Sequence, residues 1–408
     1  MSKSGLTISS PRKITMITAE YPPYIWGGIG TAVWLMAQGY LMAGYDVSVI
    51  TLAKSNKQNN QKNELIIDEG IKVYTILIDS FNSDLKNQHI VYSSKRSANA
   101  LDDMWESIKQ YVDFNLFSQS DIIILHNEEL LGLALYLKQK LQVKLLYFCH
   151  GLHKFEHPDN YELHSIQSSA VNFSDAVVAI ESHLNTVNKI FPDTICLPIR
   201  LPLSILCQQS SMSLQKPKKT RDNLLLVAAG RAVRQKGFDI LLEAYSFVSK
   251  KPINLEINIY LGHGSSDYLE MCKRKCKQLE MSYEKIFKPW QSWKILQNII
   301  SEADGLVVPS RFEPFGLIAA EAIAMETPII VSEVGGLKEL AGYGKYGYLV
   351  KSNNRNGPCP QELANTIEKF YMDRCFHQEI ALKSLNHLID FYSVDNFINS
   401  VNSALSNL

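Results

Sequence analysis

Two glutamates and the segment between them have the types and spacing that suggest chemistry. Glu313 and Glu321 lie eight positions apart, and residues 314–317 read Pro-Phe-Gly-Leu. The apolar run at 305–308 just before them is typical of a buried parallel strand. Pro is favoured at the first position of a helix, where its missing N–H costs nothing. We therefore predict a helix that begins at Pro314, with Glu313 at its N-cap.

The start of such a helix is suited to bind an anion. The N–H groups of Phe315, Gly316 and Leu317 would face a ligand with the positive end of the helix dipole behind them, which favours a phosphate. Glu321 would lie roughly 12 Å along the axis from Glu313, too far for the two to share one bond-breaking event as the carboxyls of a glycosidase do. They could hold two ends of one long ligand. Alternatively, Glu313 only caps the helix and Glu321 is solvated.

The segment resembles the signature of a known enzyme family. Glu-Pro-Phe-Gly-Leu, a second Glu after seven intervening residues, and the closing Thr327-Pro328 are similar to the E-x7-E motif of retaining glycosyltransferases with the GT-B fold. This is the GT4-like group that includes glycogen, starch and sucrose synthases. The resemblance implies that Glu313 contacts the donor sugar and Glu321 the ribose of the nucleotide. Met325-Glu326 replaces the small pair of many relatives.

A basic loop follows the apolar run at 224–229. Gly230-Arg231 and Lys236-Gly237 stand between this predicted strand and a predicted helix. Arg can bind phosphate oxygens at two points, and Lys adds a compact charge. The pattern resembles the family's Gly-Arg and Lys-Gly pair, in which both cations hold the pyrophosphate. The alternative is an ordinary solvated loop.

A glycine-rich turn lies near the start of the chain. It follows a predicted strand at 13–18 and precedes a predicted helix at 31–44, and it includes Gly28 and Gly30. Glycines there let the backbone approach a ligand closely, although a tight turn without a ligand is the alternative. The full dinucleotide fingerprint is missing, so we do not expect NAD. The resemblance implies a loop that closes over the donor phosphates or borders the acceptor site.

Two histidines follow predicted strands, His126 after 121–125 and His150 after 143–149. The resemblance implies that His150 lines the donor-sugar pocket, with its backbone carbonyl near the reacting anomeric carbon. The alternative is a histidine that is hydrogen-bonded to a neighbouring loop. We expect a structural role for His126, because the Asp of the family's His-x-His-Asp pattern is absent.

Strand and helix signals alternate along the chain, which predicts parallel, doubly wound sheets. We predict an N-terminal domain at 1–207, a polar linker at 208–222 and a second domain at 223–390, with a terminal helix at 391–408 that packs back on the first domain. The resemblance implies an α/β GT-B fold, with two Rossmann-like domains facing a central cleft. We also predict a surface loop at 54–64 and a helix at 98–115.

The composition is typical of a large soluble enzyme. The 408 residues are 46% hydrophobic, and 41 basic residues balance 41 acidic ones, so no net charge points to nucleic acid. No run of eighteen apolar residues and no signal-peptide pattern is evident, from which we expect a cytoplasmic protein. Seven scattered cysteines argue against a disulfide framework. We expect Cys272 and Cys276 to be surface or half-buried thiols rather than zinc ligands. The basic residues at 273–277 could touch anionic lipid or be solvated.

These features together predict the reaction. The resemblance implies metal-independent transfer of a sugar, with retention, from a nucleoside diphosphate sugar to an acceptor hydroxyl, without a protein nucleophile. The expected donor is a UDP-sugar, although the residues do not decide among UDP, GDP and ADP. Trp290 lies near where relatives bind the base, where it could stack on the base or pack in the core. A nucleotide-sugar epimerase of the same fold and a non-catalytic nucleotide-sugar-binding subunit remain alternatives. The acceptor and the oligomeric state are not predicted.

Overall fold

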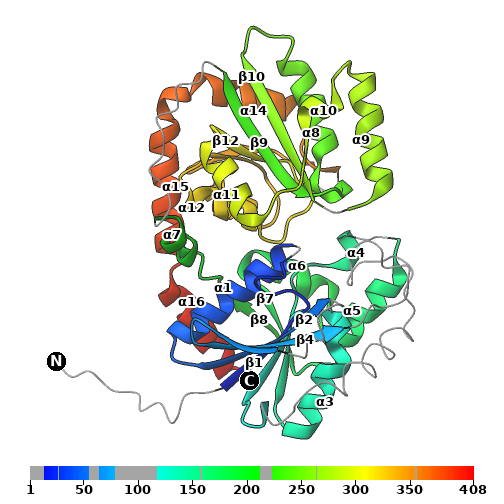
Figure 1. The fold of residues 1–408 in the computed structure, drawn as a ribbon, viewed down its shortest axis with the longest axis vertical. Helices are drawn as coiled ribbons and strands as arrows, with labels where there is room; N and C mark the ends of the chain where they lie inside the picture. Colours follow the sequence, from blue (N-terminus) through cyan, green and yellow to red (C-terminus); the bar gives the residue numbers. More distant parts are fainter. Residues whose placement is uncertain are drawn as a thin grey trace, which may run out of the picture. The chain divides into compact units, whose positions relative to one another are not determined.

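The computed structural model describes residues 13–25, 27–54, 64–78, 117–156, 159–211, 223–262, 264–353 and 356–408. Within these residues the chain forms two compact units (Figure 1). Unit 1 comprises Met1–Pro202 and Val394–Leu408, and unit 2 comprises Leu203–Ser393. The predicted helix at 98–115 and all of the predicted loop except its two end residues lie outside the described residues.

Unit 1 is built on an eight-stranded sheet with the strand order β3-β4-β2-β1-β5-β6-β7-β8. Its strands are β1 (Lys13–Ile17), β2 (Asp46–Lys54), β3 (Glu64–Asp68), β4 (Ile71–Ile78), β5 (Ile122–Leu125), β6 (Lys144–Phe148), β7 (Ala176–Ile180) and β8 (Cys196–Ile199). Its helices are α1 (Gly28–Met42), α3 (Leu131–Leu141), α4 (His153–Glu156), α5 (Tyr161–Phe173), α6 (Glu181–Ile190) and α16 (Val394–Ser406), with a 3-10 helix at Glu128–Leu130. All five residues of β7 are apolar and buried, as is typical of a strand covered on both faces.

The edge strand β3 departs from the predicted parallel sheet. It pairs antiparallel with β4, whereas the other strand pairs of this sheet are parallel. The connection consists of Glu69 and Gly70, both with positive φ. Two residues are enough for a hairpin but far too few for the crossover that a parallel pair needs.

Unit 2 contains a six-stranded sheet with the order β11-β10-β9-β12-β13-β14, and its strand pairs are parallel. Its strands are β9 (Leu224–Arg231), β10 (Leu255–Gly262), β11 (Phe287–Pro289), β12 (Gly305–Val308), β13 (Ile329–Ser332) and β14 (Tyr348–Val350). Its helices are α7 (Ser204–Ser211), α8 (Phe238–Val248), α9 (Ser266–Gln278), α10 (Tyr283–Ile286), α11 (Trp293–Glu302), α12 (Leu317–Ala324), α13 (Leu337–Leu340), α14 (Pro360–Met372) and α15 (His377–Phe391), with 3-10 helices at Arg234–Lys236, Gly342–Gly344 and Arg374–Phe376.

The predicted boundary at 207 and part of the predicted linker at 208–222 are wrong. The chain enters unit 2 after Pro202, and residues 204–211 form α7, which packs against α12 and α15 of that unit. Ile205 and Leu206 of α7 are buried, so apolar contacts hold this helix in unit 2. Residues 212–222 lie outside the described residues.

The end of the chain returns to unit 1, close to where the sequence predicts. Helix α15 ends at Phe391 in unit 2, and α16 packs on α1 and β8 of unit 1 (Figure 1, red beside blue). The Arg200 N–H donates to Ser400 Oγ over 3.2 Å. Each unit has its own hydrophobic core. Among the described residues, no helix is long and apolar enough to cross a membrane.

Candidate functional site

In unit 2, the predicted donor-binding residues gather at the carboxyl ends of β9 and β12. From β9 the chain moves outward to β10, and it later returns to form β12 on the other side of β9, so the strand order reverses there. Ligands of open parallel sheets bind at the strand ends beside such a reversal. Arg231 is the last residue of β9, and the segment 310–313 follows β12 closely.

Lys236 and Glu313, two of the predicted catalytic residues, are in direct contact. Lys236 Nζ donates to Glu313 Oε2 over 2.7 Å, and Ser310 Oγ donates to the same oxygen over 3.0 Å. The two charged side chains are only 18% and 10% exposed. A β-carbon at Gly230 would lie 3.5 Å from Lys236 Cγ, so the lysine stem crosses the end of β9 next to Arg231. The fold therefore brings together a cation and a carboxylate that are 77 positions apart in the sequence.

The backbones of the two loops are also joined directly. The Arg311 N–H donates to Gln235 C=O over 2.7 Å, and Gln235 Nε2 donates to Phe312 C=O over 3.0 Å. Gly237, with φ 68°, allows the close approach, because a β-carbon there would lie 2.0 Å from Pro309 O. These contacts fix the basic loop on both sides of Lys236 against the segment that precedes Glu313.

Arg311 holds the same loops to the first turn of α8. Its guanidinium forms a two-point ion pair with Asp239, with N···O distances of 2.7 and 2.6 Å, and Tyr268 OH donates to Asp239 over 2.8 Å. Burial alone would raise the pKa of Asp239, but Arg311 outweighs it and lowers the pKa below its ordinary value. Sequence reasoning missed Arg311 and Asp239, because an Arg after a strand and an Asp at a helix start are common separately.

The predicted start of the helix after Glu313 is wrong. Helix α12 begins at Leu317, and its N-cap is Gly316 with φ 93°. Glu313 and Pro314 therefore lie in the loop, and Glu313 is a partner of Lys236 rather than an N-cap. Gly316 is required because a β-carbon there would lie 2.3 Å from Leu337 Cδ2. Phe315, also predicted in the first turn, precedes the helix.

A second glycine turn packs against the loop that contains Glu313. Gly335 and Gly336 follow β13, and the Gly336 N–H donates to Pro314 C=O over 3.1 Å. Gly335 has φ 46°, and a β-carbon there would lie 1.7 Å from Glu313 O. The structure thus places this turn against the predicted donor-binding loop.

Glu321 lies in the middle of α12 and is buried, not solvated. Burial raises the pKa of its carboxyl to about 7, although a hydrogen bond from the side chain of Trp293 opposes the shift. Trp293 is the first residue of α11 and was not predicted as a site residue. Trp290, for which stacking on the base and packing in the core were both left open, is 43% exposed, and its ring lies 3.3 Å from a β-carbon built at Gly262.

Two further predictions concern α9. Cys272 and Cys276 are fully buried rather than surface or half-buried, because both lie on the helix face that packs into the unit 2 core. In the described part of the chain, no group of three His, Cys, Asp or Glu residues is arranged to hold a metal ion. Of the basic residues on the helix, Lys273 pairs with Glu270 and Lys275 with Glu243.

In unit 1, the strand order reverses between β1 and β5, and His126 and Asn127 follow β5 there. Asn127 Oδ1 accepts hydrogen bonds from the Ala19 N–H over 2.9 Å and from Thr18 Oγ1 over 3.1 Å. His126 Nδ1 lies 2.9 Å from His150 Nε2, so the structure brings these two predicted residues together.

Both histidines are uncharged at neutral pH. Burial lowers the pKa of His150 to about 4. Burial, with His150 as a neighbour, lowers the pKa of His126 well below its ordinary value. Their hydrogen bond is therefore between neutral rings, in which one nitrogen donates and the other accepts.

The glycine turn of unit 1 differs from the prediction. Helix α1 begins at Gly28 rather than at 31, so Gly28 and Gly30 lie in its first turn. The Gly27 N–H is bound by Glu20 Oε2 over 2.8 Å. Gly30 is buried, and a β-carbon there would lie 3.0 Å from Ile25 Cγ1. Gly30 thus serves close packing, whereas Gly28 is exposed at the helix start.

The predicted site residues are divided between the units. Unit 1 holds Gly28, Gly30 and His150, whereas unit 2 holds Arg231, Lys236, Glu313, Phe315, Gly316, Leu317 and Glu321. Two α/β units with doubly wound sheets, and polar residues at the strand ends beside each reversal, define a class of nucleotide-binding enzymes.

Comparison with known families identifies the class more closely. Residues 211–386 match the family described as glycosyl transferases group 1, and residues 26–184 match glycosyltransferase family 4. The chain is 24% identical over 402 residues to an uncharacterized glycosyltransferase of Methanocaldococcus jannaschii, covering 94% of this chain and 95% of that protein. The chain belongs to the GT4-like glycosyltransferases.

Solved structures confirm the expected GT-B fold. Sucrose-phosphate synthase from Thermosynechococcus elongatus superposes with a TM-score of 0.71 at 18% identity, over 97% of this chain and 98% of that chain. HepE of Anabaena, solved in complex with UDP and glucose, superposes with a TM-score of 0.65 at 18% identity, over 97% of this chain and 100% of that one.

Proposed function

We propose that the chain transfers a hexose-type unit, with retention at the anomeric carbon, from a nucleoside diphosphate sugar to an acceptor hydroxyl. The contact between Lys236 and Glu313 at the ends of β9 and β12 carries the proposal. An ammonium group there can bind a diphosphate, and a carboxylate beside it can accept hydrogen bonds from sugar hydroxyls. The E-x7-E resemblance of this loop supports the assignment.

In the proposed reaction, the bond between the anomeric carbon and the diphosphate oxygen breaks, and the electron pair leaves with the diphosphate. The acceptor oxygen bonds to the same face of the carbon, and its proton passes to the leaving phosphate. Negative charge grows on the diphosphate, where Arg231, Lys236 and the N-terminus of α12 stabilise it. Glu313 and the His150 backbone orient the sugar, and Glu321 binds the ribose. No protein nucleophile takes part.

We propose a UDP-sugar as the donor and no metal requirement. The bound UDP and glucose of Anabaena HepE support the choice of base. The fixed cations of the basic loop would provide the charge stabilisation that a divalent ion provides in other transferases. Gly28 and Gly30 are proposed to border the donor or the acceptor. Transfer that continues undiminished in excess EDTA is the expected outcome, whereas loss of turnover that Mg²⁺ restores would contradict metal independence.

A thermal-shift panel tests the diphosphate site. UDP, GDP, ADP and their common sugars are added without metal to the wild type, to Lys236→Ala and to Lys251→Ala. Lys251 also pairs with a glutamate of unit 2, Glu368, but it lies beyond the far end of α8. We expect UDP to stabilise the wild type and Lys251→Ala, with roughly tenfold weaker binding to Lys236→Ala from the lost charge-assisted bond. The absence of stabilisation by any nucleotide would contradict the proposal.

Product analysis separates transfer from the alternatives. With water as acceptor, NMR should detect α-glucose as the first anomer released from UDP-glucose, because retention conserves the α configuration. Release of the β anomer first would contradict retention. An isomerised nucleotide sugar would instead indicate an epimerase, and binding without any turnover would indicate a non-catalytic subunit.

A further inference from the structure

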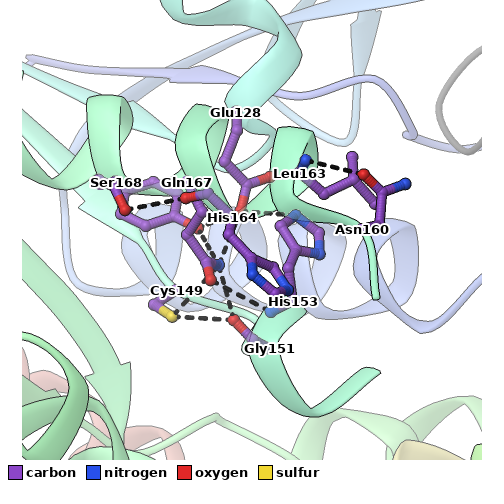
Figure 2. Close-up of polar contacts among 10 residues, drawn as sticks. Glu128, Cys149, Gly151, His153, Asn160, Leu163, His164, Gln167 and Ser168 are labelled. Atoms are coloured by element: carbon purple, nitrogen blue, oxygen red, sulfur yellow. Dashed lines mark hydrogen bonds and ion pairs between the residues drawn. The ribbon is translucent and has the colours of Figure 1, made fainter. Parts of the chain in front are cut away.

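Gln167, on α5, joins both ends of the short loop that follows His150. Its Oε1 accepts the His153 N–H over 3.2 Å, and its Nε2 donates to Gly151 C=O over 2.9 Å (Figure 2). The side chain is 3% exposed. One amide therefore holds the backbone on both sides of Leu152.

The orientation of this amide is itself fixed. Nε2 lies 3.0 Å from Glu128 Oε1 and 3.0 Å from Tyr147 OH, and the Tyr147 hydroxyl donates to Glu128. An amide nitrogen carries two hydrogens, so one is directed to Gly151 and the other is shared by Glu128 and Tyr147. A carboxylate only accepts hydrogen bonds, which prevents the amide from turning its oxygen toward Glu128.

Glu128 remains ionised because His153 lies beside it. Glu128 Oε1 and His153 Nε2 are 3.5 Å apart, and both side chains are buried. Burial alone would raise the pKa of Glu128 and lower that of His153, but the attraction between the two charges outweighs it and shifts both in the opposite directions. The His153 ring thus pairs with Glu128, and the His153 backbone N–H binds Gln167, which is itself hydrogen-bonded to Glu128.

Other contacts restrict the same peptide. Cys149 Sγ donates to Gly151 C=O over 3.1 Å, and burial raises the pKa of this thiol, so it keeps its proton. A β-carbon at Gly151 would lie 2.1 Å from Glu156 Oε1. The Gly151 carbonyl therefore receives two donors, and a side chain at this position would have to displace the Glu156 carboxylate.

We propose that Gln167 is a positioning residue for the transfer reaction. Its hydrogen bond directs the Gly151 carbonyl toward α5. This contact fixes the backbone of the preceding residue, His150, in the orientation in which it contacts the donor sugar. The inference rests on the proposed function, because it requires His150 to contact that sugar. Glu128 acts one step further away by fixing the amide of Gln167. Displacement of a reacting group by about 1 Å can cost roughly 100-fold in rate, so a loop held at both ends matters for turnover more than for binding.

Gln167→Met tests this role, because methionine keeps the length of the side chain and removes its polar contacts. With UDP-glucose as donor and water as acceptor, we expect kcat for UDP release to fall roughly 10- to 100-fold. The Kd for UDP alone should change less than about twofold, since the residues proposed to bind its diphosphate and ribose, Arg231, Lys236 and Glu321, lie in unit 2. Hydrogen exchange at the His153 amide should become faster, because that N–H loses its acceptor.

Ser168→Ala is the matched control. Ser168 is the next residue of α5, and its Oγ donates to His164 C=O over 2.8 Å, within the helix (Figure 2). The control should keep wild-type turnover and exchange. If Gln167→Met does not fold, Gln167→Asn replaces it, because it keeps the amide but is too short to bridge both ends of the loop.

The outcomes distinguish the positioning role from the function. Wild-type kcat in the Gln167 variant would overturn the positioning role alone, as would an equal loss of kcat in Ser168→Ala. A parallel loss of UDP affinity and kcat would mean general destabilisation and would also overturn the positioning role. A wild type that neither binds nor cleaves UDP-glucose would overturn the proposed function, and the exchange comparison would still show whether Gln167 holds the loop.

Discussion

At the scale of single residues, the Lys236–Glu313 pair shows how one carboxylate can serve two purposes. An ammonium group has three hydrogens, so Lys236 can keep its bond to Glu313 and still donate to a phosphate. Glu313 holds the flexible lysine in place, which reduces the entropy lost when an anion binds. A carboxylate at this point also repels a free anion, and hydrogen bonds from sugar hydroxyls would compensate. If the pair forms the proposed donor site, it would therefore favour a nucleotide sugar over a bare nucleotide.

Glu321 gives a prediction about stability and pH. Its folded-state pKa of about 7 lies above its ordinary value of 4.5, so between these pH values the folded chain holds a proton that the unfolded chain releases. The stability contributed by this group is fully present below pH 4.5 and is lost as the pH rises through 7. The shift corresponds to about 3 kcal/mol. Urea unfolding of Glu321→Gln at pH 5, 6, 7 and 8 should therefore show a smaller loss of stability with rising pH than the wild type does.

Glu326→Gln is the control for this experiment. Glu326 follows the same helix but is exposed, so its variant should keep the wild-type pH dependence. Identical pH profiles for the wild type and Glu321→Gln would mean that Glu321 titrates normally.

At the scale of elements, the site in unit 2 depends on how two loops are held together. The loop after β9 and the loop after β12 share a backbone hydrogen bond and a bond from the Gln235 side chain to the Phe312 carbonyl, and Arg311 ties both loops to α8 through Asp239. These contacts lie outside the Lys236–Glu313 pair, so the loops can keep their geometry when a ligand binds to the pair. The proposed phosphate site is thus largely preformed, which would limit the ordering cost of binding.

Arg311→Ala should destabilise unit 2 by about 3–5 kcal/mol, because it leaves the Asp239 carboxylate buried without its cation. Lys383→Ala is the control, since it removes an exposed ion pair with Glu379 and should cost no more than about 0.5 kcal/mol. Chemical unfolding of the wild type and both variants, followed with a signal from unit 2, measures the change in the free energy of unfolding. Equal stabilities would show that the buried pair contributes nothing beyond a surface contact.

The sequence predicted regular elements well and loop geometry poorly. The strand predicted at 305–308 matches β12 to the residue, and those predicted at 13–18 and 121–125 each differ from β1 and β5 by one residue, because unbroken apolar runs between polar turns have one interpretation. The starts of α1 and α12 were missed because glycines that begin a helix resemble glycines in a turn. The requirement for Gly316 comes from Leu337, twenty-one positions away, and no local pattern contains it.

Site residues followed the same division. Lys236 and Glu313 were predicted as site residues from motifs, and their contact follows from the order of the strands. Gln167 was not identified, because its role depends on Glu128, thirty-nine positions earlier, and on a loop fourteen positions earlier. A glutamine inside a helix carries no signal of such a role until the fold is known.

At the scale of the whole molecule, one unit is completed by both ends of the described chain. Helix α16 belongs to unit 1, although the whole of unit 2 separates α16 from the rest of unit 1 in the sequence. Phe397 is fully buried there, with its ring centroid 5.0 Å from that of Tyr40. A β-carbon at Gly39 would lie 2.7 Å from the Phe397 ring, so glycine allows α16 to approach α1 closely.

Phe397→Ala should therefore destabilise unit 1 by about 3–5 kcal/mol, as expected for a large core side chain replaced by a cavity. Hydrogen exchange should show faster opening of peptides from unit 1 and unchanged protection in unit 2. Phe173→Ala, which removes a 57% exposed ring of α5, is the control and should change stability by no more than about 0.5 kcal/mol. Equal loss of protection in both units would contradict the assignment of α16 to unit 1.

The return of α16 also has a consequence during synthesis on the ribosome. After Pro202 emerges, the whole of 203–393 must be translated before α16 can dock, which takes roughly 10–40 s at ordinary elongation rates. Throughout that time the nascent unit 1 displays the uncovered face of α1 and the edge of β8. That surface stays accessible to chaperones on the growing chain until α16 has been translated and packs on α1 and β8.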